Sequence, residues 1–440
     1  MSTHDRSTHD RFDAIVIGAG PAGATAAILL ARAGWSVALV EKREFPRRKV
    51  CGECIAASNL GLLDALGLGA QFAAIAGPPL SRVALMAGRD TLVAPMPALA
   101  DGPHRFGRAL GREHLDTMLA ARARALGATL LQPCTVRAVA GTHGDWRCEV
   151  VPAEAAGPSD GARLLRAPVL VSAHGSWDPQ PKGLLEACAG PDPDPDPPKR
   201  PGDLFAFKSS WRDARLAPGL LPVLSFPGGY GGIVLGDHGI VTLACCIRRD
   251  ALQAIRKAAP GVSAAEAVDA HLRDACAGVA DALRGARRSA AWLSVGPIRP
   301  GIRIGRAPDA PFAIGNAAGE THPIIGEGIS MAMQSAFMLA ERLLADDGGP
   351  VRDAAALRAI AIGHADAWRS AFAPRLRLAA VLSHLAMRPW LARPLLPLLR
   401  ARPALMTLAA RVAGKARCAV TPQALPATEP AIRTPGESLR

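Results

Sequence analysis

One segment, Phe12 to Arg43, constrains the fold of this 440-residue chain more than any other. It reads FDAIVIGAGPAGATAAILLARAGWSVALVEKR: an apolar strand, a glycine-rich turn, a helical run of small residues and a second apolar strand. Gly18, Gly20 and Gly23 give the spacing G-x-G-x-x-G directly after the first strand, and Glu41 ends the second. This order predicts a βαβ unit that binds a dinucleotide, with the diphosphate at the helix N-terminus and Glu41 on the ribose hydroxyls.

Each glycine of the turn has a mechanical role in this prediction. Gly18 permits the tight turn, Gly20 lets the backbone approach a diphosphate, and Gly23 lets the helix pack closely on the strand. Two other interpretations are a βαβ unit whose glycines serve only the turn and a membrane span, because 14–31 contains no charged residue. Glycines and a proline inside this run weaken a lipid-facing helix and argue against the span. We therefore expect cofactor contacts from Gly18, Gly20, Pro21, Ala22, Gly23, Glu41 and Lys42.

The composition is that of a globular protein, with 49% hydrophobic and 20% charged residues. A chain of 440 residues is long for one core, so we expect two domains or one domain with a large insertion. Aromatic residues make up only 4%, which argues against stacking platforms for bases and against a nucleic-acid partner. The nine irregularly spaced cysteines are typical of reduced thiols in a cytoplasmic protein.

The two ends of the chain differ in composition from the rest. The N-terminal MSTHDRSTHDR has no apolar core, so we expect a disordered tail and not a signal peptide. Near the other end, 369–417 contains ten basic residues and no acidic one, is rich in Leu and Ala, and is divided by prolines from Pro374 to Pro403. This predicts short basic amphipathic helices. One interpretation is that these helices contact the inner face of a membrane or an anionic lipid-like ligand. The other, which we favour, is that they form a terminal layer whose arginine face is solvated.

Strand and helix patterns along the chain predict an α/β fold. Strand-like segments at 135–139, 146–151 and 169–172 suggest a β-meander, 203–247 is rich in strands, and 250–290 looks helical. We expect a discontinuous cofactor domain and a sheet that covers the substrate. The cofactor domain would comprise 10–75, 105–180 and 290–345, the substrate-covering domain 76–104 and 181–289, and the C-terminal basic helical segment 346–425.

Three further motifs accompany the glycine turn. Arg47 to Glu53 contains K-V-C-G-E, Arg112 to Asp116 reads R-E-H-L-D, and Gly315 to Gly319 reads G-N-A-A-G, followed by P-I-I-G-E-G over Pro323 to Gly328. Together the four motifs resemble the FAD-dependent group that contains hydroxylases of the para-hydroxybenzoate hydroxylase type, geranylgeranyl reductases and flavin-dependent halogenases. The matching patterns are K-x-C-G-G/E of the geranylgeranyl reductase branch, R-x-x-L-D, and G-D-A-A-G with P-x-x-G-x-G.

The resemblance implies FAD bound by a Rossmann-like domain of the glutathione reductase type, with a mixed sheet, an inserted β-sheet substrate domain and C-terminal helices. It implies NAD(P)H as the reductant. The helix start at Gly328 offers N–H donors and a partial positive charge, which stabilise the negative edge of a reduced flavin. The further cofactor contacts that it implies are Arg112, His174, Gly315, Asn316, Gly326, Glu327 and Gly328.

The sequence departs from the family pattern in two places. The usual G-D becomes Gly315-Asn316, and the internal D-G becomes His174-Gly175, so that two carboxylates expected near the cofactor are missing. Asn316 can still hydrogen-bond a ribityl hydroxyl. His174 replaces an aspartate that the family links to the use of FAD and NAD(P)H. The flavin could therefore receive its electrons from a separate donor protein. The alternative interpretation is that His174 is only a residue of a surface turn.

Three functions are compatible with the sequence. The two enzymatic ones act on a small hydrophobic or aromatic substrate, and the third has no substrate. The preferred one is a flavin monooxygenase that hydroxylates an aromatic or phenolic lipid or polyketide-like substrate. The second is a reductase of isoprenoid double bonds, and the third is a non-catalytic flavin-binding or electron-transfer protein, which the two missing carboxylates keep open. A halogenase is disfavoured because the chain has no W-x-W-x-x-P segment.

Cys51 and His322 are the candidate catalytic residues. The resemblance places Cys51 on the substrate side of the flavin, with plain packing as the alternative, and His322 precedes the flavin-closing loop. Cys51 and Cys54 form C-x-x-C, but no second C-x-x-C and no ordered His spacing accompany them, so we expect no metal site. The simplest interpretation of Glu327 is that, as an acidic residue at a helix start, it interacts favourably with the helix dipole.

Overall fold

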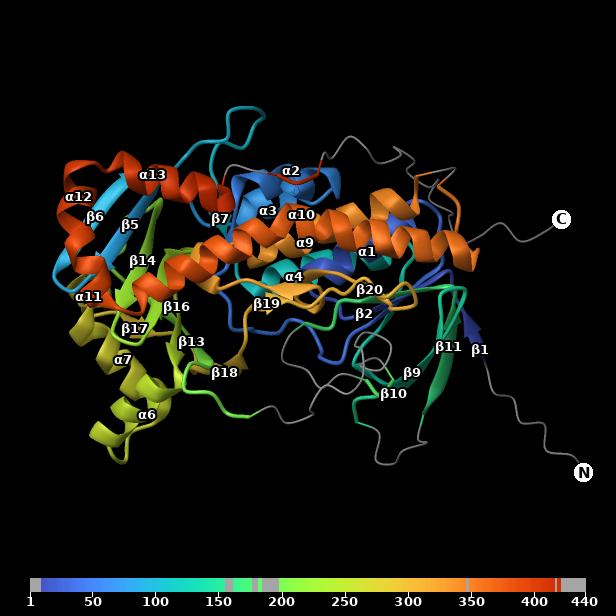
Figure 1. Ribbon diagram of the computed structural model, residues 1–440, viewed down its shortest axis with the longest axis horizontal. Helices are drawn as coiled ribbons and strands as arrows, with labels where there is room; N and C mark the ends of the chain where they lie inside the picture. The colour runs from blue at the N-terminus through green and yellow to red at the C-terminus, as the bar shows by residue number, and fades with distance from the viewer. Residues whose placement is uncertain are drawn as a thin grey trace, which may run out of the picture.

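The computed structural model describes residues 9–154, 161–175, 181–183, 198–345, 348–415 and 418–420. Within these residues, three larger sheets and their helices form an elongated molecule, with the sheet of β5, β6 and β14 at one end and that of β9 to β11 at the other (Figure 1). Of the expected disordered tail, residues 1–8 lie outside the described residues, and the expectation is wrong for His9–Arg11, which form strand β1 parallel to β11.

A five-stranded parallel sheet contains the N-terminal βαβ unit. Its strand order is β20-β12-β2-β3-β8, and all described neighbours run parallel. The strands are β2 (Ala14–Ile17), β3 (Val37–Val40), β8 (Thr129–Leu131), β12 (Val169–Ser172) and β20 (Phe312–Ala313). β2, β3 and β12 are buried along their whole length, as expected of parallel strands covered on both faces.

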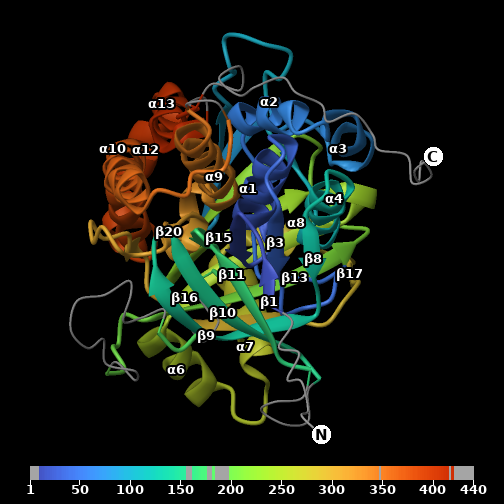
Figure 2. The same ribbon diagram turned by 90° about the vertical axis from the view of Figure 1, so that its right-hand side faces the viewer.

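Two different layers cover this sheet. Ala14 and Val16 pack with the helices, whereas Ile15 and Ile17 pack with a four-stranded sheet on the opposite face (Figure 2). The helices are α1 (Pro21–Arg32), α4 (Arg112–Ala125) and α9 (Gly328–Leu343). The four-stranded sheet consists of β1, β9 (Cys134–Thr142), β10 (Asp145–Pro152) and β11 (Arg163–Ala167). The predicted α/β fold class is therefore observed.

The predicted β-meander is wrong at its third strand. The segments near 135–139 and 146–151 pair as β9 and β10, but 169–172 is β12, which lies between β2 and β20 in the parallel sheet. The sequence of β12 is VLVS, without polar alternation, and all four residues are buried. Such a run fits a central parallel strand better than a half-exposed meander strand.

The second large sheet has eight strands in the order β17-β13-β16-β15-β14-β5-β6, with β18 paired to β13. Neighbours are antiparallel except β5 and β14. The strands are β5 (Arg82–Ala87), β6 (Asp90–Pro95), β13 (Leu204–Arg212), β14 (Leu220–Phe226), β15 (Gly229–Leu235), β16 (Val241–Arg248), β17 (Arg287–Arg288) and β18 (Leu293–Ile298). Thus β18 belongs to this sheet, although it falls within the predicted cofactor segment 290–345.

Helices cover both faces of the eight-stranded sheet. One face packs on α6 (Arg249–Ala258), α7 (Ala264–Ala275) and α8 (Ala277–Ala282). The other face packs on helices from the C-terminal segment. These helices are α10 (Ala354–Ala386), α11 (Pro389–Ala392), η4 (Arg393–Leu395), α12 (Leu396–Ala401), α13 (Ala404–Ala410) and η5 (Arg411–Lys415).

The expected break at Pro374 is wrong, because α10 continues through it for 33 residues. The buried side chains of Trp368, Phe372 and Leu376 pack on Met331 and Met338 of α9. This packing on both sides of the proline outweighs the lost backbone hydrogen bond. As a result α10 runs from the parallel sheet to the eight-stranded sheet (Figure 1).

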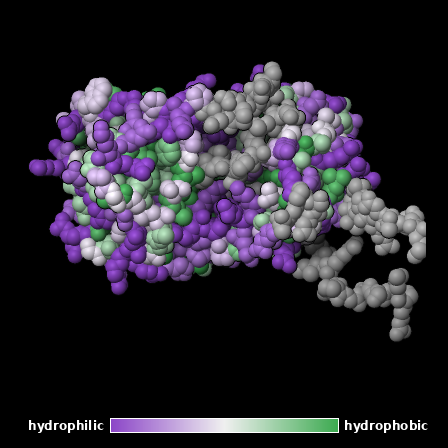
Figure 3. Space-filling view, turned by 90° about the horizontal axis from the view of Figure 1, so that it is seen from below, coloured by the Kyte–Doolittle hydropathy of each residue, from purple (hydrophilic) through white to green (hydrophobic). Residues whose placement is uncertain are grey.

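Short elements connect these layers. They are β4 (Cys54–Ile55), α2 (Ala57–Ala65), α3 (Gly69–Ile75), β7 (Arg108–Ala109), η1 (Asp237–Gly239), β19 (Gly301–Ile302), η2 (Gly315–Ala317), β21 (Gly319–Glu320) and η3 (Pro323–Ile325). Among the described helices, none combines the length and apolar character that a membrane crossing requires. The face seen in Figure 3 is mainly hydrophilic, with apolar side chains in small groups.

Candidate active site

The glycine turn leads from β2 into α1. Gly18 has a φ of +100°, and a Cβ there would lie 2.5 Å from the carbonyl oxygen of Ala173. A Cβ at Gly23 would lie 1.8 Å from the carbonyl oxygen of Gly18. A Cβ at Gly20, in contrast, would meet only Nη2 of Arg112, at 3.7 Å. Gly18 and Gly23 therefore close the turn, and Gly20 borders open space beside the Arg112 guanidinium.

The N-terminus of α1 faces this space without a side-chain cap. Pro21 is the first helical residue and has no N–H, so Ala22 and Gly23 carry the first backbone donors. Backbone N–H groups at a helix N-terminus, together with the helix dipole, bind anions. The α1 N-terminus and the neighbouring Arg112 guanidinium therefore offer the donors and positive charge that a diphosphate requires.

Glu41 belongs to a buried charge network beside the turn. Its carboxylate accepts a hydrogen bond of 3.0 Å from the backbone N–H of Ala19. Nη2 of Arg47 lies 3.6 Å from Glu41 and 3.6 Å from Asp116. Arg112 donates two hydrogen bonds of 2.7 Å to Asp116. Burial lowers the pKa of Arg112, but the Asp116 carboxylate raises it above its ordinary value, so the guanidinium stays charged.

His174 lies beside the glycine turn, at the end of β12. Its Nδ1 is 2.8 Å from Oγ of Ser172. His174 lines a cleft of about 70 Å³ on the side of the turn and borders a second cleft of about 180 Å³ on the side of β20. The first cleft is also lined by Gly18, Gly20, Glu41 and Lys42. The structure thus brings five sequence-predicted cofactor residues together.

The fourth motif meets the start of α1. Gly315 has a φ of +57°, and a Cβ there would lie 2.8 Å from Cβ of Ala22. The side-chain amide of Asn316 donates to Glu320 at 3.3 Å, and its backbone carbonyl accepts a 2.8 Å hydrogen bond from Arg303. Two motifs almost 300 residues apart in the sequence therefore share one end of the parallel sheet.

The loop before α9 holds a buried ion pair. Gly326 turns the chain with a φ of +60°, and Glu327 is fully buried with no hydrogen bond to its carboxylate among the described residues. Nζ of Lys415 lies 3.2 Å from Glu327, donates to the Gly326 carbonyl at 3.1 Å and lies 3.8 Å from Sγ of Cys54. A Cβ at Gly328 would meet nothing within 4 Å, so the helix start faces open space.

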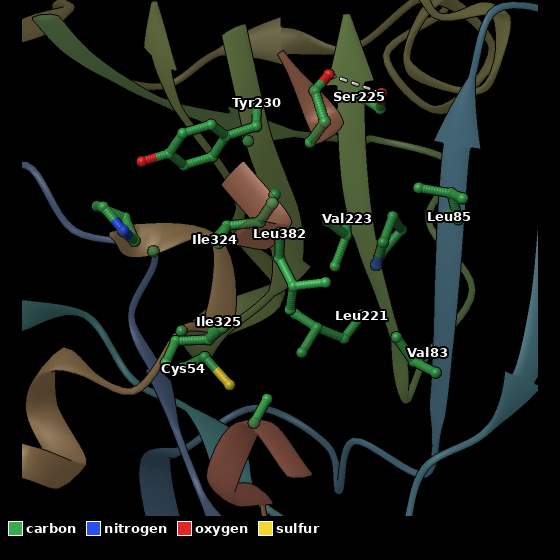
Figure 4. A pocket seen from close by; sticks show the side chains of 18 of the residues that line it. Cys54, Val83, Leu85, Leu221, Val223, Ser225, Tyr230, Ile324, Ile325 and Leu382 are labelled. Carbon is green, nitrogen blue, oxygen red and sulfur yellow. Dashed lines mark hydrogen bonds between the residues drawn. The ribbon is translucent and has the colours of Figure 1, made fainter. Parts of the chain in front are cut away.

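An apolar cavity of about 410 Å³ extends from this loop between the eight-stranded sheet and the C-terminal helices. Leu221 and Val223 from β14, Leu382 from α10 and Ile325 point into one space (Figure 4). Aliphatic side chains dominate the lining, and none of the described residues that line the cavity is acidic. The hydroxyl of Ser225 is already committed, because it donates to the Ala386 carbonyl at 2.8 Å.

Cys51 lies where the cavity meets the charge network. It lines the cavity and is half-buried, and its thiol interacts with the Arg112 guanidinium. Sγ of Cys51 also accepts a 3.3 Å hydrogen bond from the backbone N–H of Glu53. Cys54 faces Lys415 instead, and burial raises the pKa of its thiol above the ordinary value. The two cysteines therefore have different surroundings.

His322 stands behind the cavity wall. Its Nδ1 is 3.2 Å from the hydroxyl of Tyr230, which lines the cavity, and its ring is 6.3 Å from that of His384. Burial, assisted by His384, lowers the pKa of His322 to about 4, so its imidazole is neutral near pH 7. His322 does not itself line the cavity but contacts Tyr230, which does.

Sequence reasoning missed several residues of this region. Lys208 of β13 is 1% exposed and pairs with Glu53, which also accepts a 2.6 Å hydrogen bond from Thr242. Burial raises the pKa of Glu53, and Lys208 opposes that shift. A lysine inside the apolar strand pattern LFAFKSSW was the available signal for this pair. Lys415 and Tyr230 lie in no motif, so nothing in the sequence marked them.

One group of residues has ligand types suited to a metal, although no metal site was expected. Ligand atoms of His114, Asp237 and His238 lie within 4.8 Å of one another. Bonds from zinc to nitrogen or oxygen ligands are about 2.0–2.2 Å long. Two atoms bound to the same zinc ion must therefore lie closer to each other than the 4.8 Å limit found here. The group lies at the start of α4 and the turn before β16, outside the clefts and the cavity.

Comparison with known proteins identifies the domain built on the glycine turn. Residues 11–184 match the family model described as FAD binding domain. This region is an FAD-binding domain. The site described above fits FAD, because open space adjoins Gly20, Arg112 and the uncapped α1 N-terminus, and further open space adjoins the start of α9 at Gly328.

Relatives match part of this chain, and solved structures extend the likeness in fold beyond the matched domain. Menaquinone reductase from Mycobacterium tuberculosis is 33% identical over 159 residues, which are 36% of this chain and 38% of the relative. The chain thus matches under two fifths of that relative's length. The flavin-dependent brominase Bmp2 superposes with a TM-score of 0.67 at 18% identity, over 93% of this chain and 94% of that one. PqsL, described as a "probable FAD-dependent monooxygenase" from Pseudomonas aeruginosa, gives a TM-score of 0.67 at 18% identity, over 88% and 100%.

These findings confirm the fold class, FAD as the cofactor and the resemblance to the FAD-dependent group inferred from the four motifs. The solved structures, all below 25% identity, show that the flavoprotein has the fold of flavin-dependent monooxygenases and halogenases. The roles of individual site residues and the domain boundaries stay predictions.

Proposed function

We propose that this flavoprotein is an oxidoreductase that reduces a carbon–carbon double bond in the long chain of an isoprenoid-like lipid. The observation that carries the proposal is the apolar cavity, which extends from Cys51 and Gly326 beside the cofactor region into the space under the C-terminal helices. A cavity of about 410 Å³ with aliphatic walls suits a chain of carbon atoms better than a polar ring.

The cavity changes the preference between the two reactions considered from the sequence. Hydroxylation of a phenol is aided by a base or hydrogen-bond acceptor that activates the ring. Of the lining residues that the structure describes, none is acidic; Lys415 is paired with Glu327, and the Ser225 hydroxyl donates its hydrogen bond to the Ala386 carbonyl. Reduction of an isolated double bond needs no such activation of a ring oxygen, which supports the reductase. The curated relatives named menaquinone reductase support the same choice.

The residues of this chain divide the work between binding and proton supply. Bound FAD supplies two-electron redox chemistry, with NAD(P)H proposed as the reductant. The α1 N-terminus and Arg112 would hold its diphosphate, Glu41 its ribose, and Asn316 its ribityl chain. The thiol of Cys51, which faces the cavity from the cofactor side, would hold the proton that the reduced double bond receives together with a hydride.

A specific observation also favours hydroxylation as a second candidate. The Tyr230 hydroxyl lies on the cavity wall and is 3.2 Å from the neutral imidazole of His322. This pair offers one hydrogen-bonding position for a phenolic head group. A phenolic lipid with its ring at Tyr230 and its chain along the aliphatic wall would place the ring within the cavity.

The test is a product analysis of the purified holoprotein. The protein is incubated with NADPH and either a menaquinone with an unsaturated side chain or a polyprenylated phenol, with and without oxygen, and the products are analysed by mass spectrometry. The proposal expects a gain of two hydrogen atoms that does not require oxygen and is lost in Cys51→Ala but retained in Cys54→Ala. A gain of one oxygen atom, only in air, would replace it with the hydroxylase.

Reduction of the bound flavin is measured in the same samples. His174 and Asn316 replace the two expected carboxylates, so NADH, NADPH and dithionite are compared as reductants. Flavin reduced only by dithionite would assign the electrons to a separate protein donor. Reduced flavin without any lipid product would favour the electron-transfer protein.

A further inference from the structure

We infer that the helices α11, η4, α12, α13 and η5 dock this protein on the surface of an anionic phospholipid bilayer and open the apolar cavity toward it. This inference deepens the proposed function, since it rests on a lipid substrate and supplies the route by which that lipid enters. The bilayer would contact the exposed apolar side chains of these helices, which together are called the docking face. The docking face comprises Trp390, Leu391, Leu395, Leu398, Leu405, Leu408 and Val412.

Exposed apolar side chains are concentrated on these helices. Among the described residues, eight of the eleven large hydrophobic side chains that are exposed lie between residues 381 and 412. Trp390 is 67% exposed, Val412 59% and Leu408 54%. Singly scattered exposed apolar residues are ordinary, whereas this concentration on one run of short helices favours an interaction surface. Tryptophan and leucine are the residues that anchor interfacial helices in the headgroup region.

The charge around the docking face matches an anionic surface. No acidic residue occurs between Asp366 and Glu429. Arg393, Arg402 and Arg411 are exposed and make no ion pair with the residues that the structure describes. Arg400 is different, because Asp90 of β6 pairs with it at 2.5 Å. Basic residues near an anionic leaflet each contribute to membrane binding.

The same helices also form the wall of the cavity. Leu399, Met406 and Ala410 line it from α12 and α13, and Leu382 lines it from α10. Leu395 and Leu405 line the cavity and are nevertheless 43% and 38% exposed, so the cavity reaches the surface beside them. A chain that leaves the bilayer between these two leucines would enter the cavity without crossing water.

A bilayer explains the docking face better than a second copy of the chain. Two copies that met through it would bring two sets of unpaired arginines together, and like charges across an interface disfavour association. An anionic bilayer offers apolar contact and opposite charge at once. No described helix is suited to cross a membrane, so the contact would be confined to the surface.

The experiment is vesicle cosedimentation of the holoprotein without substrate. Vesicles of phosphatidylcholine with phosphatidylglycerol are compared with phosphatidylcholine alone. We expect binding to the anionic vesicles that weakens with salt, and a blue shift of tryptophan fluorescence that Trp390→Ser removes. The triple variant Arg393→Glu/Arg402→Glu/Arg411→Glu should bind at least about a hundredfold more weakly, at roughly fivefold per arginine. Trp390→Ser/Leu398→Ser/Leu408→Ser should also lose binding.

Matched controls lie on the helices of the opposite face. Val262→Ser removes an exposed apolar side chain beside α7, and Arg256→Glu/Lys257→Glu reverses exposed charges on α6; both should bind vesicles as the unchanged protein does. Bound flavin and thermal unfolding are recorded for every variant to show that it is folded.

Three outcomes would overturn the inference. They are no binding of folded holoprotein to anionic vesicles, equal loss in the controls, or a dimer in analytical ultracentrifugation that the apolar triple variant dissociates without any vesicle binding. Because vesicle binding requires no turnover, a protein that binds vesicles but converts no lipid counts against the proposed function alone. A protein that converts detergent-solubilised lipid but ignores vesicles counts against docking alone.

Discussion

A single lysine, Lys415, is the ion-pair partner of the buried carboxylate in the loop before α9. Glu327 is fully buried and Lys415 is its ion-pair partner at 3.2 Å. We expect Lys415→Met to lower the free energy of unfolding by about 3–5 kcal/mol, because it leaves a buried charge unpaired. Glu327→Gln/Lys415→Met should recover most of that loss in urea denaturation. Arg411→Met, an exposed neighbour, is the control and should stay within about 0.5 kcal/mol; equal effects of Lys415→Met and Arg411→Met would argue against the pair.

The open space at Gly20 makes a second prediction at the residue scale. Gly20→Val would place a side chain between the turn and Arg112, where the diphosphate is expected, and its Cβ would lie 3.7 Å from Nη2 of Arg112, at ordinary van der Waals distance. We expect less than a tenth of the flavin content of the unchanged protein and a similar unfolding temperature for both apoproteins. Gly61→Ala, where a Cβ would meet nothing within 4 Å, should retain flavin and gain up to about 1 kcal/mol of stability. Full flavin content in Gly20→Val would refute the assignment.

Residues with strict backbone requirements were predictable from the sequence, and those defined by distant partners were not. Gly18 and Gly23 lie where the motif predicted because only glycine fits there. Lys415 carries no local mark, since its role depends on Glu327, to which only the folded chain brings it close. His322 was identified as a candidate, but its contact with the cavity wall through Tyr230 depends on a strand in another part of the chain.

At the scale of elements, α10 carries a proline that its packing overrides. Pro374 is exposed inside the helix, so replacement removes no buried contact. We expect Pro374→Ala to raise the free energy of unfolding by about 1–3 kcal/mol, because it restores a helical N–H. Pro389→Ala is the matched control: Pro389 opens α11, a position that suits proline, and the change should bring no gain. A loss of stability in Pro374→Ala would indicate that the kink is required.

The contact between α10 and β20 predicts a pH dependence. His364 is 1% exposed, and its Nε2 lies 3.0 Å from the carbonyl oxygen of Ala313. Burial lowers the pKa of His364 from 6.5 to about 4. Between these values the unfolded chain takes up a proton that the folded protein does not, so stability falls as the pH drops from 6.5 to about 4 and this effect is absent above 6.5. The loss is on the order of 3 kcal/mol.

His364→Gln isolates this effect, since glutamine keeps a donor for the Ala313 carbonyl but does not titrate. Unfolding free energies are measured from pH 7.5 to 4, and the readout is the difference between the two curves. We expect the unfolding free energy of the variant to rise steadily relative to that of the unchanged protein as the pH falls below 6.5. Parallel curves would show that His364 is protonated in the folded protein as readily as in the unfolded chain.

Elements with strong local patterns were predictable, and their partners were harder to assign. The βαβ unit at 14–40 and the helix after Gly328 appear where their periodicity predicted them. β12 was assigned to the wrong sheet because a strand of four residues does not reveal which neighbours it pairs with. The length of α10 was missed because a proline weighs heavily in local reasoning and α9, its packing partner, does not enter it.

At the scale of the whole molecule, the cavity exists only because three parts of the chain meet. The loop before α9 closes one end, the eight-stranded sheet forms the floor, and the C-terminal helices form the roof. No one of these parts would hold a long apolar substrate alone. The sequence indicated a greasy ligand through the leucine-rich C-terminus, but it did not show that these leucines face a cavity connected to Cys51.

The depth of this cavity should set the length of the chain that it accepts. Val83 of β5 lies across the cavity from Cys54 and Ile325 (Figure 4), far from the cofactor side. Val83→Phe adds volume at that end, so a long isoprenoid chain must bend or withdraw, whereas a short chain still fits. We expect KM for the longest accepted chain to rise about tenfold or more, with kcat/KM for the shortest chain within about twofold. Val93→Phe makes the same substitution on β6, where the side chain is 44% exposed, and should leave both unchanged. Equal losses for short and long chains in Val83→Phe would mean that the substrate does not extend to β5, and that the cavity does not measure chain length.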